Sequence, residues 1–168
     1  MLTKNHYRQL KEKVSLSPYK HGPCWELCGG LCCREPHSED WEYVLEFFPF
    51  EEPLVSRRMF PRLGKYEVQC LFPADSRSSC DKTLFCHLAP SYPAFERGAH
   101  VGVTIDPEIE SCPLMRYPAK VSIEFMRAAF SVWKEVLSLL PPERVTHYKS
   151  QFRRFLNEKK IKKVWKFC

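Results

Sequence analysis

The sequence predicts a small single domain of the α+β or mainly α class, with extensive irregular loops and a pair of C-terminal helices. The chain has 168 residues, of which 44% are hydrophobic and 14% aromatic, and this supports one domain with its own core. The last third has strong helical periodicity, whereas the middle is rich in turn-forming residues and cysteine. We place the main domain at residues 1–140 and a basic helix or tail at residues 141–168.

Three segments in the first half of the chain have a recognisable pattern. Residues 3–14 carry apolar side chains at helical spacing, which predicts a short amphipathic helix ended by SLSPYKHGP. Residues 41–50, WEYVLEFFPF, are too apolar for a surface loop and predict a buried strand or short helix. The alternation in YEVQCLF, residues 66–72, predicts a strand.

The next segment, residues 73–118, is rich in Pro, Gly, Ser and Asp. A stretch of this kind packs poorly by itself. We therefore expect something other than regular secondary structure to hold it in place.

The C-terminal third predicts two helices. KVSIEFMRAAFSVWKEVLSLL, residues 120–140, has one apolar face, and Pro141 and Pro142 end the segment. Because proline suits the first turn of a helix, Pro142 predicts the start of a second one, with an apolar face on one side and a dense basic face on the other. The apolar positions are Met126, Ala129, Phe130, Trp133, Leu137 and Leu140 in the first helix, and Val145, Tyr148, Phe152 and Phe155 or Leu156 in the second.

Eight of the nine cysteines precede the tail and fall into two groups of four. The first group lies in CWELCGGLCCR, residues 24–34, and the second is spread over residues 70–112. Four thiols are the ligand set of one tetrahedral site, so the two groups predict two zinc sites, or an iron–sulfur cluster with a second site. We expect this centre to organise the loops. The candidate ligands are Cys24, Cys28, Cys32 and Cys33, then Cys70, Cys80, Cys86 and Cys112.

Spacing within the first group constrains how it binds a metal. On one straight helix, Cys24 and Cys32 would lie about 12 Å apart, whereas two sulfurs on one zinc ion lie only about 3.8 Å apart. A straight helix therefore cannot bring both to one ion, and Gly29 and Gly30 allow the chain to fold around it. Because neighbouring side chains of an extended chain point to opposite sides, we expect Cys32 and Cys33 to serve different sites, or one to bind metal while the other packs.

The cellular compartment bears on whether these thiols bind metal or form disulfides. The first twenty residues alternate charged and apolar side chains and lack the apolar core of a secretory signal, and no run approaches a membrane span. We therefore expect a reducing cytoplasm, where clustered cysteines are more often metal ligands or redox groups than structural bridges. Reactive thiols without metal, and a disulfide scaffold exported without a recognisable signal, are the alternatives.

The cysteine motifs resemble those of the CxxCxxCC proteins, the YkgJ-type domain that chelates zinc or iron. CWELCGGLCCR resembles the first cysteine box of this family, and CDKTLFCHLAPSYP resembles its later Cys-Arg-x-x-Pro segment, with His87 in place of the arginine. FPFEEPLV, residues 48–55, and SCPL, residues 111–114, are similar to its linking segment and its final cysteine. The resemblance covers roughly residues 20–140 and implies a metal or iron–sulfur centre. The first two spacers have three residues where the family has two, so the ligand assignment within the box stays open.

Several other residues near the cysteines are weaker candidates. His37 and His87 could each complete a coordination sphere, although a surface or turn histidine is the more common case. Asp81 and Asp106 are more typical of turns than of residues that support a metal ligand. Trp25 and Phe85 flank candidate ligands, and such shielding aromatic rings slightly favour a cluster over zinc.

No sequence motif predicts a particular reaction. The chain has no Ser-His-Asp arrangement and no phosphate-binding glycine loop, so whether it is an enzyme stays open. The alternative from this class is an accessory or maturation enzyme with a redox-active or methyl-transfer iron–sulfur centre.

The positive charge lies at the C-terminus. The net charge is +6, and residues 141–168 hold nine Lys and Arg against two Glu, a local balance of +7. Residues 144–166 therefore offer a surface for nucleic acid or an acidic protein, and an RNA-binding or adaptor module is a second alternative function. A solvated helical face is the plainer explanation. Cys168 lacks the context of a lipidation site and is interpreted as an ordinary thiol.

Overall fold

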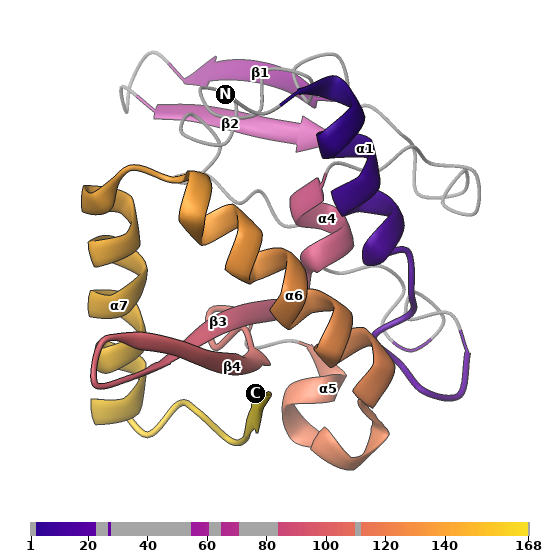
Figure 1. The fold of residues 1–168 in the computed structure, drawn as a ribbon, viewed down its shortest axis with the longest axis vertical. Helices are drawn as coiled ribbons and strands as arrows, with labels where there is room; N and C mark the ends of the chain where they lie inside the picture. The colour runs from indigo at the N-terminus through magenta and orange to yellow at the C-terminus, as the bar shows by residue number, and fades with distance from the viewer. Residues whose placement is uncertain are drawn as a thin grey trace.

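The structure is a computed structural model that describes residues 3–22, 27, 55–60, 65–70, 84–109 and 112–167. Within these residues it combines helices with antiparallel strands, so the fold is of the mixed α+β kind (Figure 1). The segment 41–50 lies outside the described residues. The elements are α1 (Lys4–Lys13), β1 (Val55–Phe60), β2 (Lys65–Cys70), α4 (Leu84–Leu88), β3 (Ser91–Glu96), β4 (Ala99–Ile105), α5 (Pro113–Arg116), the 3-10 helix η4 (Pro118–Lys120), α6 (Ile123–Leu139), α7 (Pro142–Asn157) and β5 (Val164–Lys166).

Helix α1 confirms the amphipathic helix predicted for residues 3–14. Thr3 caps it, because its side-chain oxygen accepts a hydrogen bond from the backbone N–H of His6 at 3.2 Å. Tyr7, Leu10 and Val14 are buried, as their helical spacing predicts. The helix packs against α4 and α6.

Strands β1 and β2 form an antiparallel hairpin in which Val55 pairs with Cys70 and Phe60 with Lys65. The predicted strand at residues 66–72 is thereby confirmed as β2, shifted slightly toward the N-terminus. Its partner β1 was not predicted. The sequence VSRRMF has two adjacent charges that break the alternation expected of a strand.

Contrary to the expectation that something other than regular secondary structure holds residues 73–118 in place, this segment contains α4, β3, β4 and α5. Strand β3 escapes the pattern because it includes Pro93, which has no N–H to donate to a ladder. The proline is tolerated because β3 is an edge strand, in the order β3-β4-β5. A register shift opposite Ala94 and Phe95 leaves Val101 of β4 without a partner in the β3–β4 ladder, which breaks the alternation of β4.

The β3–β4 hairpin turns through Arg97 and Gly98, whose φ angles are 47° and 83°. Positive φ at both central residues is the feature of a type I′ turn, which matches the twist of a two-residue hairpin. Strand β5 then pairs with the other edge of β4, with Trp165 opposite Val103. Gly102 makes this pairing possible, because a Cβ atom there would lie 2.1 Å from the backbone oxygen of Trp165.

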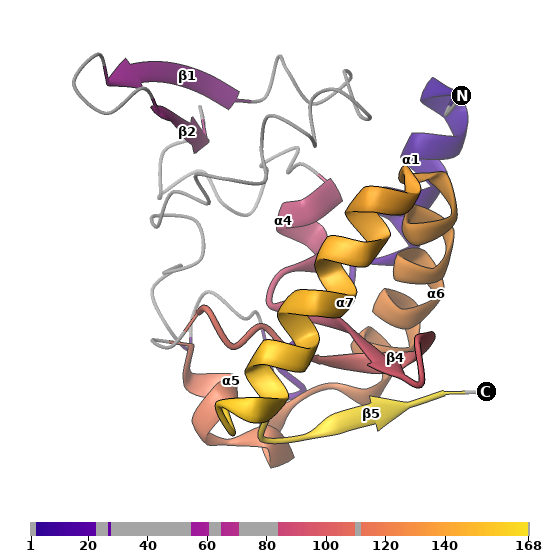
Figure 2. The same cartoon turned by 90° about the vertical axis from the view of Figure 1, so that its left-hand side faces the viewer.

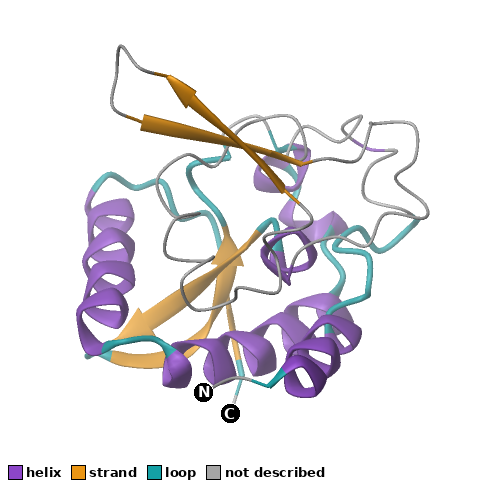
Figure 3. Ribbon diagram, turned by 90° about the horizontal axis from the view of Figure 1, so that it is seen from above, coloured by secondary structure: helices purple, strands orange, loops and turns teal. Residues whose placement is uncertain are grey.

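Helices α6 and α7 confirm the predicted C-terminal pair. Ser122 caps α6 by accepting a hydrogen bond from the N–H of Phe125 at 3.2 Å, and α7 begins at Pro142 as predicted. In α7 the buried face includes Phe155, whereas Leu156 is 48% exposed. Both helices pack on the three-stranded sheet, and Figure 3 shows the strands crossing the space between them.

Residues 141–168 share the core of the rest of the chain. Tyr148, Phe152 and Phe155 of α7 and Trp165 of β5 belong to one buried cluster with residues of α1, α4, the sheet and α6. The tail also gains a strand, β5, that its basic composition does not predict. No described helix has the length and apolar character needed to cross a membrane.

Candidate metal centre

The described residues include the backbone of Cys70 and Cys86 and the complete side chain of Cys112. Cys70 is the last residue of β2, and Cys86 is the central residue of α4. The other five candidate ligands lie outside the described residues; these are Cys24, Cys28, Cys32, Cys33 and Cys80. His37, Asp81 and Trp25 lie outside them as well. The structure therefore positions the backbone at three members of the second group, Cys70, Cys86 and Cys112.

Helix α4, which carries Cys86, is fixed to the core at both of its ends. Leu84 and Leu88 are fully buried. The carbonyl of Leu88 accepts a hydrogen bond from the hydroxyl of Ser91 at 2.6 Å. Oγ of Ser91 in turn accepts a hydrogen bond from Nε1 of Trp133 on α6 at 3.0 Å. Because these bonds are buried, losing one would leave a polar atom without a partner, so they tie α4 firmly to α6.

Cys112 lies in the core, where its exposed fraction is 6%. Its N–H donates to the carbonyl of Ile109 at 2.9 Å, and its own carbonyl accepts from the N–H of Met115 at 3.0 Å. Ile109 and Leu114 beside it are also buried. The backbone of Cys112 is therefore held in place from both sides, within apolar surroundings.

The chain approaching the first cysteine group is attached to the start of α6. The carbonyl of Pro18 accepts from the N–H of Ser122 at 2.9 Å, and the N–H of Lys20 donates to the carbonyl of Lys120 at 3.1 Å. Tyr19 forms a β-bridge with Val121 between these two bonds. The strap formed by residues 17–22 thus holds the chain to the core as far as two positions before the first cysteine of the sequence.

Two basic residues lie on or beside α4. Lys11, on the helix that packs against α4, is 9% exposed, with Nζ 5.6 Å from the centroid of the Tyr7 ring. His87 on α4 is half-buried. Lys11 was not singled out from the sequence, because KEK in an amphipathic helix normally indicates a solvated face.

Asp106 has the role in a turn that its residue type favours. Its Oδ1 accepts a hydrogen bond from the N–H of Glu108 at 2.9 Å, which is the geometry of an Asx turn. Among the residues that the structure describes, no three His, Cys, Asp or Glu side chains gather in a way that could hold a metal ion. Phe85 belongs to α4, where only its backbone is described.

Comparison with known proteins adds no relative to this picture. No protein-family model, no curated protein and no solved structure matches the chain. The resemblance to the CxxCxxCC family therefore stays a prediction from the cysteine motifs.

Proposed function

We propose that the chain is a metal-binding protein that holds zinc or an iron–sulfur cluster through the thiolates of its two cysteine groups. The observation that carries the proposal is the distribution of cysteine, with eight of nine residues in two groups of four. Thiolates are soft ligands that suit zinc and iron–sulfur clusters rather than magnesium or calcium. The ligands would be Cys24, Cys28, Cys32 and Cys33, with Cys70, Cys80, Cys86 and Cys112.

The surroundings of Cys112 fit such a group. A buried thiolate is stable only when its charge is compensated, and a metal ion supplies that compensation directly. The segments that carry Cys86 and Cys112 are both fixed to the core by hydrogen bonds, as is the strap that leads to the first group. Zinc in a closed thiolate site would contribute folding energy, whereas an iron–sulfur cluster would add electron transfer.

The decisive measurement is metal analysis of the full-length protein purified without oxygen, combined with its visible spectrum. We expect at least one zinc ion per chain in a colourless protein, or iron and sulfide in a brown one. A protein isolated without bound metal, which binds neither Zn²⁺ nor reconstituted iron and sulfide, contradicts the proposal.

Single substitutions then assign the ligands. We expect Cys28→Ser and Cys112→Ser each to lower the metal content, because serine is a poor ligand for these metals. Cys168→Ser is the matched control, since it removes a thiol from outside both groups and should leave the metal content unchanged. Because a serine hydroxyl in the core can itself destabilise the fold, the spectrum of Co²⁺ in the zinc form provides an independent count of thiolate ligands. A spectrum without sulfur-to-cobalt charge transfer would refute thiolate binding.

A further inference from the structure

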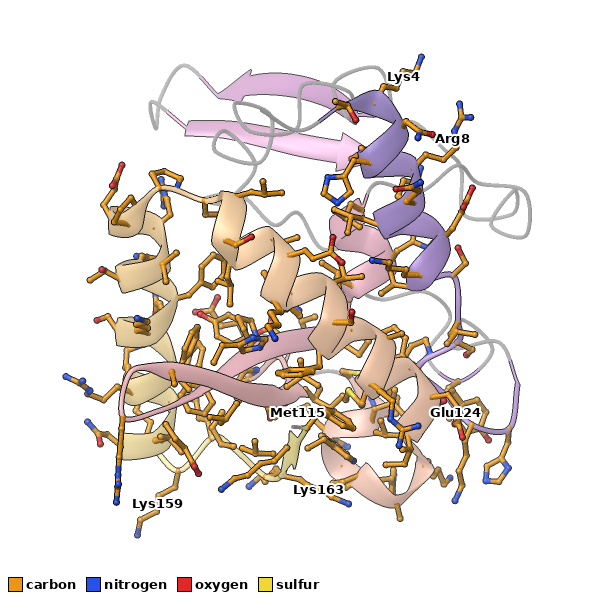
Figure 4. All side chains as sticks on the ribbon, in the orientation of Figure 1. Lys4, Arg8, Met115, Glu124, Lys159 and Lys163 are labelled. Carbon is orange, nitrogen blue, oxygen red and sulfur yellow. The ribbon has the colours of Figure 1, made fainter. Side chains whose placement is uncertain are left out.

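We propose that this protein also binds the phosphates of a nucleic-acid duplex, through a basic surface formed by Arg97, Arg153, Lys159, Lys162 and Lys163. These residues lie on α7, on the segment after it and in the β3–β4 turn. Figure 2 shows α7 and β5 on the side that faces the viewer, and Figure 4 shows Lys159 and Lys163 at the end of the molecule opposite Lys4 and Arg8. This proposal does not depend on the metal centre.

Ion pairs divide the cations of this region into two sets. Three of them are already matched by carboxylates: Arg154 binds Glu108 at 2.8 Å, Lys160 binds Glu158 at 3.2 Å and Lys166 binds Glu96. Within the part of the chain that the structure describes, none of the five residues of the basic surface makes an ion pair. Their charges are therefore available to an anionic partner, although Nζ of Lys163 also lies 5.0 Å from the centroid of the Trp165 ring.

Two of these cations occupy backbone positions that favour other residues. Arg97 and Lys159 have φ angles of 47° and 55°, and they are the non-glycine residues with positive φ in the described chain. The first position of a type I′ turn favours asparagine or glycine, and the residue that ends a helix in this conformation is usually glycine. Placing a lysine or arginine there costs about 1 kcal/mol each. Both positions thus place an exposed cation where glycine or asparagine would be less strained.

The two aromatic residues near the C-terminus bear on whether the anionic partner is single-stranded or double-stranded. Trp165 is 6% exposed, and Phe167 is half-buried against the ring of Phe130, with centroids 5.5 Å apart. The ring of Trp165 is therefore not available to stack on the bases of a single strand, and that of Phe167 already packs against Phe130. Recognition then rests mainly on charge, which suits the regularly spaced phosphates of a duplex.

Apolar exposure argues against a protein or membrane partner. Protein interfaces have an apolar centre with aromatic anchors, and membrane surfaces require apolar side chains that enter the lipid. On the described part of α7 and β5, Leu156 is the one large hydrophobic residue with substantial exposure. A surface of cations around a single leucine fits a phosphate backbone better than either alternative.

The test is the salt dependence of binding between the full-length protein and a fluorescently labelled 20-base-pair duplex, measured by fluorescence anisotropy. The variant replaces Arg153, Lys159 and Lys162 by Gln. Because each phosphate contact contributes about −0.9 to the slope of log K against log salt concentration, losing three contacts should make the slope shallower by about 2.7.

The matched control replaces Lys4, Arg8 and Lys20 by Gln, which removes the same charge from exposed positions elsewhere. We expect this control to keep the wild-type slope. Circular dichroism and thermal melting establish that both variants fold. Where the triple variant melts early, the single substitution Lys162→Gln, expected to change the slope by about 0.9, replaces it.

Four results would overturn the proposal. They are no binding of the duplex at 50 mM salt, equal slopes in the variant and the control, tighter binding of single-stranded oligothymidine than of the duplex, and tighter binding of polyglutamate or of phosphatidylserine vesicles. The last result would assign the basic surface to an acidic protein or to a membrane instead.

Discussion

His100 supplies a pH dependence of stability that can be isolated by one substitution. Its ring lies on β4 between Phe95 and Phe130, with centroid distances of 5.8 and 4.8 Å. Within the described residues, neither ring nitrogen has a hydrogen-bond partner of normal geometry. Burial lowers the pKa of His100 from its ordinary 6.5 to about 4; the backbone of Gly102 opposes this effect, and the charge of Lys134 adds to it.

The sign of the effect follows from the two protonation states. Because the pKa is lower in the folded state, the unfolded chain binds the proton first as the pH falls below about 6.5. Stability therefore decreases between pH 6.5 and about 4, whereas at pH 7 the histidine is neutral in both states. At pH 4.5 the linked loss is at most about 2.6 kcal/mol, and we expect about 1.5 kcal/mol because part of the ring reaches solvent.

The assay is urea denaturation of the wild type and of His100→Phe at pH 7 and at pH 4.5. Between these pH values, we expect the free energy of unfolding to fall by about 1.5 kcal/mol more in the wild type than in the variant. At pH 7 the variant should also be more stable by about 1 kcal/mol, because two unpartnered polar atoms have been removed from the core. Acid effects on the carboxylates are common to both proteins and cancel.

His147→Gln is the control, since this histidine is exposed on α7 and its loss should leave the pH dependence unchanged. An equal loss of stability in the wild type and in His100→Phe would refute the reasoning. It would mean that the ring is solvated when the protein is folded.

Four further substitutions test the fold. Gly102→Ala should lower the free energy of unfolding by about 3 kcal/mol, because the added Cβ meets the backbone of β5. Gly98→Ala should lower it by only about 1 kcal/mol, because Gly98 has a φ of +83° but open space around it. Equal melting temperatures of the two variants would show that β5 is not paired as described. Lys159→Gly should raise the free energy of unfolding by up to about 1 kcal/mol, seen as a higher melting temperature, because glycine suits the positive φ at this position. The same substitution should weaken duplex binding. Glu135→Gln should cost about 0.5–1 kcal/mol at pH 7, because this carboxylate forms an ion pair with Nζ of Lys13 at 2.5 Å and a hydrogen bond with Nε2 of His6 at 2.8 Å. Burial raises the pKa of Glu135, but the bonds from Lys13 and His6 outweigh it and lower the pKa below its ordinary 4.5, so the contribution of Glu135 is present above pH 4.5 and decreases as the pH falls further; the difference between the variant and the wild type in urea denaturation should shrink accordingly.

The helices were predictable because their pattern is local. Each of α1, α6 and α7 buries one face, and the spacing of apolar residues along the chain records that face. Thr3, Ser122 and Pro142 also mark helix starts by chemistry that acts within one turn.

The sheet was not predictable, because its strands depend on partners distant in sequence. Strand β5 has three residues, and its position is set by Gly102, more than sixty residues earlier. Strand β3 contains Pro93, which an edge strand accommodates, and β4 contains a bulge at Val101; neither is evident from a sequence pattern. The charge of the basic surface was visible in the sequence. The ion pairs that occupy neighbouring cations such as Lys166, and the burial of Trp165, depend on tertiary contacts.

The contrast between local patterns and contacts distant in sequence also applies to the cysteines. Their grouping is a local property and predicts a thiolate centre, whereas the anchoring of the segments that carry them is not local. The strap at residues 17–22 and helix α4 are both attached to α6, so residues 23–83 begin and end on one rigid support. The entropy cost of bringing the two ends of a loop together grows only with the logarithm of the loop's length. A metal ion that joins the two cysteine groups would attach the segments that carry them to this support, so we expect metal loss to lower the stability of the chain between the strap and α4 before that of α6, α7 and the sheet.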